Sequence, residues 1–280
     1  ALQEGNSVTV STLNNTVDSF GHALAAGTSY YAVGAPDTES AKGAVFTYYQ
    51  DQLGQFNLRP SIRPAGLNAS DQFGYSLTMS GNGRHLFVGA PGKNTVYAYT
   101  IVEIPTISKK VFTVVGASGS ATKNYALGFT PISAESLSVV DEGGRVYLPN
   151  VDWTLSGSTI QFVANVLENY QIVVRQLDYF TLVNTIAGSG SSSGDKFGNA
   201  IDVDDQGRNL IIGAPNATVS SVSNAGEAYV FAQLVQKFAG DGTTTAFTTE
   251  ATLQTKIFVE VNGVLQVETD NPDIPVDNDG

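Results

Sequence analysis

The residues that could perform nucleophilic or acid–base chemistry are few in this chain. Cysteine is absent, which excludes disulfides, thiolate metal sites and cysteine nucleophiles. The two histidines are His22 and His85, so a Ser-His-Asp triad would need one of them. His22 lies in a predicted strand and His85 beside a predicted turn, where we expect structural or solvent-facing roles. Nucleophilic catalysis is therefore disfavoured.

Acidic residues are abundant, with 26 Asp and Glu against 14 Lys and Arg. The net charge of −12 repels phosphate backbones and anionic lipids, which disfavours nucleic acid and membrane surfaces as partners. No apolar run approaches the roughly 20 residues that insert into a bilayer as a helix. No acid stands in a repeated, apolar-flanked context that would raise its pKa, which disfavours a paired-carboxylate hydrolase site but keeps it as an alternative.

Three copies of one motif supply the elements that must position any site. Each copy begins with Phe-Gly and ends with Gly-Ala-Pro, and the Phe-to-Gly separations are 14, 16 and 16 residues. The motif residues are Phe20, Gly21, Gly34, Pro36, Phe73, Gly74, Gly89, Pro91, Phe197, Gly198, Gly213 and Pro215. Such self-similarity predicts one structural unit used three times.

Each unit is predicted to begin with a hairpin. Polar and apolar side chains alternate after Phe-Gly, which is the period of a strand, and a glycine-bearing turn follows. The next strand is continuously apolar, as in residues 86–88 and 210–212, and such a run predicts burial on both faces. Aromatic residues two positions apart, such as Tyr97 and Tyr99, mark a third strand.

The fourth strand is identified by its spacing. Phe56 and Phe180, each followed two residues later by Leu, lie 17 residues before Phe73 and Phe197. The third strand reaches this element after 8 residues in the first unit and after 81 in the second. About 70 residues are therefore inserted between the third and fourth strands of the second unit.

Four antiparallel strands with a doubly buried inner strand describe a β-propeller blade. The Phe-Gly and Gly-Ala-Pro motifs resemble the FG-GAP repeats of integrin-type propellers over residues 17–100 and 180–232. We predict an all-β fold of FG-GAP-type blades, three in this chain, interrupted by inserted small β-sandwich-like modules. The predicted boundaries are residues 1–104 for blades 1 and 2, 105–177 for a module, 178–235 for the last strand of blade 2 and blade 3, and 236–280 for the start of a second module.

The two predicted modules share a pattern of strands and turns. Val111-Phe112 corresponds to Lys237-Phe238, and both follow the third strand of a blade. The pattern resembles β-modules of bacteriophage tail-fibre and other virion structural proteins. That resemblance implies a virion surface protein and not a catalyst.

The propeller resemblance also implies a place for a metal. Integrin-type blades often carry a calcium loop in the first hairpin, and the third unit offers Asp202, Asp204, Asp205 and Asn209 there. The loop is one residue short of that pattern, and Asn209 replaces its final acid. We expect a plain hairpin with solvated acids and no cofactor, with calcium as the alternative.

The leading interpretation is a non-enzymatic structural and receptor-binding protein of a phage tail, fibre or baseplate. Its expected partners are other virion proteins and a host cell-surface glycan or protein, and self-association stays open. The alternatives are a secreted or surface-attached bacterial adhesin and a polysaccharide-acting enzyme. Loops after Gly-Ala-Pro differ most in length, which favours them for contact. The candidates there are Asp37, Thr38, Glu39, Lys93, Asn94, Asn216, Thr218 and Asn224.

Three units are fewer than the roughly four to eight blades that close a propeller. We therefore expect these residues to belong to a longer architecture. If the 124 residues from Phe73 to Phe197 repeat, another Phe-Gly pair falls near position 321.

Overall fold

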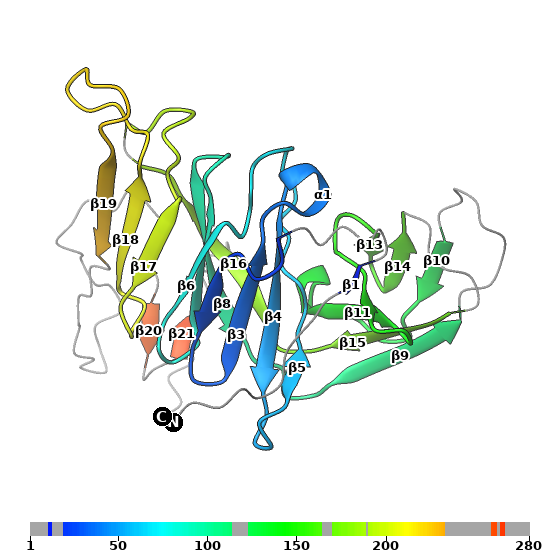
Figure 1. The fold of residues 1–280 in the computed structure, drawn as a ribbon. Helices are drawn as coiled ribbons and strands as arrows, with labels where there is room; N and C mark the ends of the chain where they lie inside the picture. The colour runs from blue at the N-terminus through cyan, green and yellow to red at the C-terminus, as the bar shows by residue number, and fades with distance from the viewer. Residues whose placement is uncertain are drawn as a thin grey trace, which may run out of the picture. The chain divides into compact units, whose positions relative to one another are not determined.

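The computed structural model of the chain shows an all-β protein, which confirms the predicted fold class (Figure 1). It describes residues 11–12, 19–113, 123–163, 170–188, 190–232, 259–261 and 264–266. The chain divides into two compact units, residues 1–233 and 234–280. In the second unit, the described residues form a hairpin of β20 (Val259–Val261) and β21 (Val264–Gln266). The rest of the predicted second module lies outside the described residues, and the predicted domain boundaries stay a prediction.

Two four-stranded antiparallel sheets form the first two blades. Blade 1 consists of β2 (Leu24–Ala26), β3 (Tyr30–Ala35), β4 (Ala44–Gln50) and β5 (Phe56–Leu58). Blade 2 consists of β6 (Ser76–Met79), β7 (His85–Ala90), β8 (Thr95–Val102) and β16 (Tyr179–Ile186). Strand β16 pairs antiparallel with β8 and places Phe180 opposite Ile101. The chain therefore completes blade 2 after the insertion, as the spacing before Phe197 predicts.

Blade 3 contains three strands among the described residues. They are β17 (Ala200–Val203), β18 (Asn209–Ala214) and β19 (Glu227–Ala232), paired antiparallel in that order.

The insertion folds as two small sheets around a core of its own. One sheet has the strand order β1 (Ser11–Thr12), β12 (Arg145–Val146), β11 (Leu137–Asp141), β15 (Gln171–Gln176) and β9 (Ser108–Thr113). The other has the order β10 (Lys123–Ala126), β14 (Thr159–Phe162) and β13 (Trp153–Ser156). The core contains Trp153, Phe162 and Ile172, all at most 1% exposed. A 3₁₀ turn, η1 (Ala134–Ser136), precedes β11.

The repeated glycines have two physical reasons in this fold. The first glycine of each unit donates its amide to the carbonyl of the second, as in Gly74 to Gly89 (3.1 Å) and Gly198 to Gly213 (3.1 Å). Gly74 and Gly198 have φ of +90° and +88°, which side chains other than hydrogen rarely allow. In addition, a Cβ at Gly89 would overlap the carbonyl oxygen of Gly198 in the next blade, so this position needs glycine for close approach.

Each blade has two faces. We call the face on which the blade's own Phe-Gly phenylalanine packs the leading face, and the opposite face the trailing face. Phe73 lies in the cluster between blades 1 and 2, and Phe197 lies in the cluster between blades 2 and 3. Both are fully buried. The leading face of blade 1 is covered differently, because Phe20 packs there with Val146 and Leu148 of the inserted module.

Two residues are less buried than the equivalence of the three units predicts. Phe20 is only partly buried, because its neighbour is the small module and not a preceding blade. In β18, Ile211 is 47% exposed although the run at residues 210–212 is continuously apolar. Ile211 points to the trailing face of blade 3, on which no described sheet packs. The same run in β7 is buried on both faces, because blades lie on either side of it.

In the part of the chain that the structure describes, helical structure is limited to η1 and to α1 (Thr38–Ala41), a single turn in which Glu39 and Ser40 have left-handed backbone angles. Among the described residues, no helix is long and apolar enough to cross a membrane.

Candidate functional site

The first loop after Gly-Ala-Pro is tied to the scaffold. The Ser19 hydroxyl donates to Asp37 (2.5 Å), and Glu39 forms an ion pair with Arg63 (2.6 Å). The Thr38 side chain is 2% exposed. The three predicted contact residues of this loop therefore hold it in place and offer little free surface.

The second loop joins blades 2 and 3. The Asn94 side chain donates to the Ser191 hydroxyl (3.1 Å) and accepts the Phe197 amide (2.8 Å). Lys93 lies 3.5 Å from the Asp71 carboxylate of its own blade. Both predicted contact residues thus have structural partners.

The third loop, residues 216–226, is the one that stands free. All side chains of residues 218–225 are exposed, and Ala217 is the buried anchor at the base of the loop. The predicted contact residues here are Asn216, Thr218 and Asn224, all exposed. Backbone hydrogen bonds between Val219 and Val222 give the loop a turn of its own. It extends beyond the sheet between β18 and β19 (Figure 1).

The four candidate calcium ligands, Asp202, Asp204, Asp205 and Asn209, do not share one centre. Asp202 accepts from the Thr78 hydroxyl of blade 2 (3.3 Å), whereas both Asp204 oxygens accept hydrogen bonds within the hairpin. Asn209 donates a hydrogen bond from its side-chain nitrogen to Asp204. A cation shared by the two residues would need the side-chain oxygen of Asn209, and not its nitrogen, directed toward the Asp204 carboxylate. In the described ranges, no group of three or more His, Cys, Asp or Glu could hold a metal ion together. The arrangement does not fit calcium, which stays a hypothesis.

Asp204 instead belongs to a turn that recurs in the described chain. Asp51, Asp141 and Asp204 each accept the amide four residues later, and each is followed at the third position by a glycine with positive φ. Hydrogen bonds from the amides of Gln55 and Arg208 lower the pKa of Asp51 and Asp204, respectively. These acids shape hairpins, and the pattern Asp-x-x-Gly is the sequence signal for them.

One acid contradicts the expectation that no carboxyl group has a raised pKa. Asp152 is 2% exposed, and burial raises its pKa to about 6 although it accepts the Leu148 amide (2.7 Å). Its second oxygen has no hydrogen-bond partner among the described residues. The negative charge of Glu39 adds to the shift and the positive charge of Arg63 opposes it. Asp152 belongs to the module, whereas Glu39 and Arg63 belong to loops of blade 1. Asp152 therefore lies at the joint, that is, the contact, between the module and blade 1.

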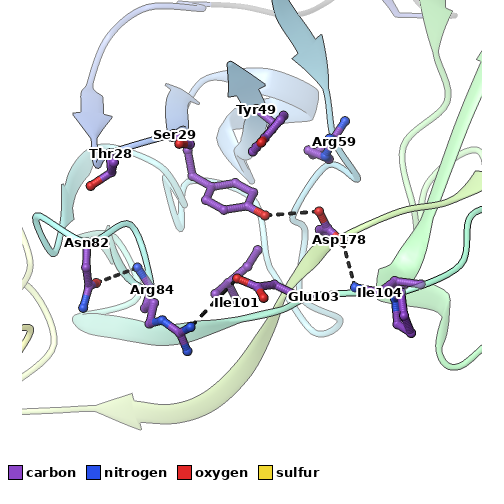
Figure 2. Close-up of a pocket in the computed structure, with 12 residues that line it drawn as sticks. Thr28, Ser29, Tyr49, Arg59, Asn82, Arg84, Ile101, Glu103, Ile104 and Asp178 are labelled. Atoms are coloured by element: carbon purple, nitrogen blue, oxygen red, sulfur yellow. Dashed lines mark hydrogen bonds and ion pairs between the residues drawn. The ribbon is translucent and has the colours of Figure 1, made fainter. Parts of the chain in front are cut away.

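A pocket of about 800 Å³ opens where the first hairpins of blades 1 and 2 turn (Figure 2). These hairpins contribute Ser29 and Asn82, and the chain around β16 contributes Asp178. This is the opposite end of the strands from the Gly-Ala-Pro loops, so the pocket and the predicted contact loops lie at different ends of the blades.

Tyr30 and Asp178 both line the pocket and contact each other. The Tyr30 hydroxyl donates to Asp178 (3.1 Å), and the Ile104 amide donates to the other oxygen of Asp178 (2.7 Å). Burial, reinforced by the Asp178 charge, raises the pKa of the Tyr30 phenol, which therefore stays a donor at neutral pH. Beside them the Arg59 guanidinium lies 4.8 Å from the centre of the Tyr49 ring.

The family model of the FG-GAP repeat matches residues 180–231. The chain contains FG-GAP repeat sequence. The match spans β16 to β19, so it runs from the last strand of blade 2 through the three described strands of blade 3. No curated protein matches the chain.

The pocket residues were missed because nothing in the FG-GAP pattern points to them. Val183 stands in blade 2 at the place that Arg59 occupies in blade 1, and Asp178 stands at the junction between the module and β16. Only the return of the chain from the module brings Asp178 next to Tyr30, which is 148 residues away in the sequence.

Proposed function

We propose that this chain is a non-enzymatic structural and recognition protein of a bacteriophage tail, fibre or baseplate, and that it contacts a host-surface glycan or protein through the loop at residues 216–226. The observation that carries the proposal is the contrast among the three FG-GAP loops. Asp37, Glu39 and Asn94 in the first two are engaged by the scaffold, whereas the third loop is long, exposed and polar. Binding residues concentrate in such loops on rigid sheets.

The virion setting is supported by the module between β8 and β16, because its strand and turn pattern resembles modules of virion structural proteins. A secreted or surface-attached bacterial adhesin would use the same loop in a different setting. Labelling purified phage particles with antibody against this chain separates the two settings, since an adhesin would label the bacterial surface instead.

The test of recognition is to shorten the loop. Residues 218–225 would be replaced by two residues, as many as separate Pro91 from Asn94, so that the buried Ala217 stays in place, and adsorption to host cells would be measured. We expect adsorption to fall while the midpoint of thermal unfolding stays within a few degrees, because those side chains make few contacts with the blades. Unchanged adsorption would contradict the proposal.

A matched control alters an equally exposed turn at the other end of the blades. Leu53 is 84% exposed in the hairpin between β4 and β5, and Leu53→Ser changes surface without touching the proposed loop. We expect this variant to adsorb like the unmodified protein.

A further inference from the structure

The pocket between the first hairpins of blades 1 and 2 carries one cation without a carboxylate partner. Arg84 and Glu103 lie 4.0 Å apart and balance each other, and each oxygen of Asp178 accepts one hydrogen bond. Among the described residues, no carboxylate oxygen lies within 4.0 Å of the Arg59 guanidinium. In a chain of net charge −12, an unpaired arginine beside a pocket is a binding group for an anion.

Arg59 is held in place by groups that leave the outer edge of its guanidinium unpaired. The ring of Tyr49 supports one face of the guanidinium at 4.8 Å, and the Arg59 amide donates to the Thr47 carbonyl (2.8 Å). Its Nε is shielded and has no hydrogen-bond partner among the described residues. Figure 2 shows Arg59 beside Tyr49, with Asp178 below it. The Tyr49 ring and the backbone hydrogen bond therefore keep the guanidinium beside the pocket before any ligand arrives.

The rest of the lining matches a small polyhydroxylated ring. Ile101 and Ile104 offer an apolar wall, while the carboxylates of Glu103 and Asp178 offer oxygen acceptors for hydroxyl groups. A volume of about 800 Å³ lies in the range of small-molecule sites. The two nearby carboxylates disfavour a doubly charged phosphate, whereas a single carboxylate gains a bidentate partner in arginine.

We propose that this pocket binds a hexuronic acid, a sugar that carries one carboxylate. Arg59 pairs with the carboxylate of the sugar, and the part of the pocket around Asp178 accepts hydrogen bonds from the ring hydroxyls. The site lies at the other end of the blades from residues 216–226 and does not depend on that loop. Shortening the loop therefore leaves sugar binding unchanged, and the two proposals fail separately.

The test titrates the full chain with sodium glucuronate, glucose, the methyl ester of glucuronate and acetate, by calorimetry and by saturation-transfer NMR. Glucuronate binds, and glucose and the methyl ester bind at least about 10-fold more weakly, because both lack the charge-assisted pair. Acetate also binds more weakly, because it has no ring. Equal binding of glucose overturns the assignment of Arg59, equal binding of acetate overturns the sugar, and no binding of glucuronate overturns the site.

Two variants assign the effect to the residue. Arg59→Gln removes the preference for glucuronate over glucose, and Arg59→Lys retains part of it because the charge stays while the fork is lost. Arg208→Gln is the control, since it removes the same charge from an exposed turn of blade 3. A preference that survives in a folded Arg59→Gln variant contradicts the proposal, and the ester comparison decides the matter should that variant not fold.

Discussion

Phe73 shows at the scale of one residue how adjacent blades are held together. Its ring makes edge contacts with Tyr97 and Tyr99 of its own blade, whose centres lie 5.2 and 6.3 Å away. It is fully buried in the cluster that also contains Ala32 and Val45 of blade 1. Phe197 repeats the same geometry in blade 3. We expect Phe73→Ala to lower the free energy of unfolding by about 3–5 kcal/mol, because it leaves a cavity between two sheets. Urea unfolding followed by fluorescence measures the loss.

Phe20→Ala is the matched comparison for that prediction. Phe20 is partly buried and contacts Phe46 at 5.6 Å, so the same truncation removes fewer contacts. It should cost clearly less than Phe73→Ala. A change below about 1 kcal/mol at Phe73 would show that the phenylalanine does not lie in the core.

Asp152 makes stability depend on pH at the joint between module and blade 1. Its folded pKa of about 6 lies above that of an unfolded aspartate, so the native state binds the proton more tightly. Its contribution to stability therefore increases as pH falls from 7 through 6 and levels off below about 4. The whole effect is on the order of 3 kcal/mol at most. Thermal unfolding between pH 4 and 7.5 should detect it.

Because many other acids titrate in this range, the informative quantity is a difference. Asp152→Asn keeps an oxygen to accept the Leu148 amide and cannot ionise. We expect the difference in stability between wild type and Asp152→Asn to change with pH between 4 and 7. A difference that is independent of pH would place the Asp152 pKa near its ordinary value.

At the scale of elements, the Asp-x-x-Gly turns determine where hairpins reverse. Asp204 fixes the turn between β17 and β18 through the Arg208 amide (2.7 Å). We expect Asp204→Ala to lower the midpoint of thermal unfolding and Asp204→Asn to lower it less, since asparagine still accepts the amide. The order should be the same in excess calcium and in chelator. A large upward shift of wild type with calcium would instead favour the metal interpretation.

The strands and their pairing could be predicted from local patterns in the sequence, whereas the pocket of Arg59 and Asp178 could not. The spacing of Phe180 before Phe197 predicted that β16 completes blade 2 across the insertion, because a repeat preserves distances along the chain. The pattern could not predict that Ile211 is exposed, since burial depends on which sheet packs next. Arg59 and Asp178 form a pocket through contacts between distant segments, for which the sequence carries no periodic signal.

For the molecule as a whole, the two faces at the ends of the row of blades differ. Val146 and Leu148 of the module cover the leading face of blade 1. On the trailing face of blade 3, the cross-strand pair Ile211 and Val230 is 47% and 71% exposed. The equivalent pair in blade 2, Phe87 opposite Ala98, is 8% and 7% exposed because blade 3 lies on it. An exposed apolar sheet face of this kind favours association.

The last prediction uses two equivalent glycines to test whether that face is free in solution. A Cβ at Gly89 would overlap the Ser76 hydroxyl of its own blade and the Gly198 carbonyl of the next blade, whereas the nearest atom to a Cβ at Gly213 lies 3.7 Å away. We expect Gly89→Ala to lower the midpoint of thermal unfolding strongly. Gly213→Ala should leave it unchanged or raise it slightly, because alanine restricts the unfolded chain.

Gly213→Ala is informative in either direction, because nothing described in the chain packs on that glycine as Gly198 packs on Gly89. If it destabilised the protein as much as Gly89→Ala, the trailing face of blade 3 would be covered in solution. Sedimentation at several protein concentrations would then show whether a second copy covers it. If Gly213→Ala did not destabilise the protein, the stability of the chain would come from the two blade interfaces and the module. Ile211 could then be replaced by threonine without loss of stability.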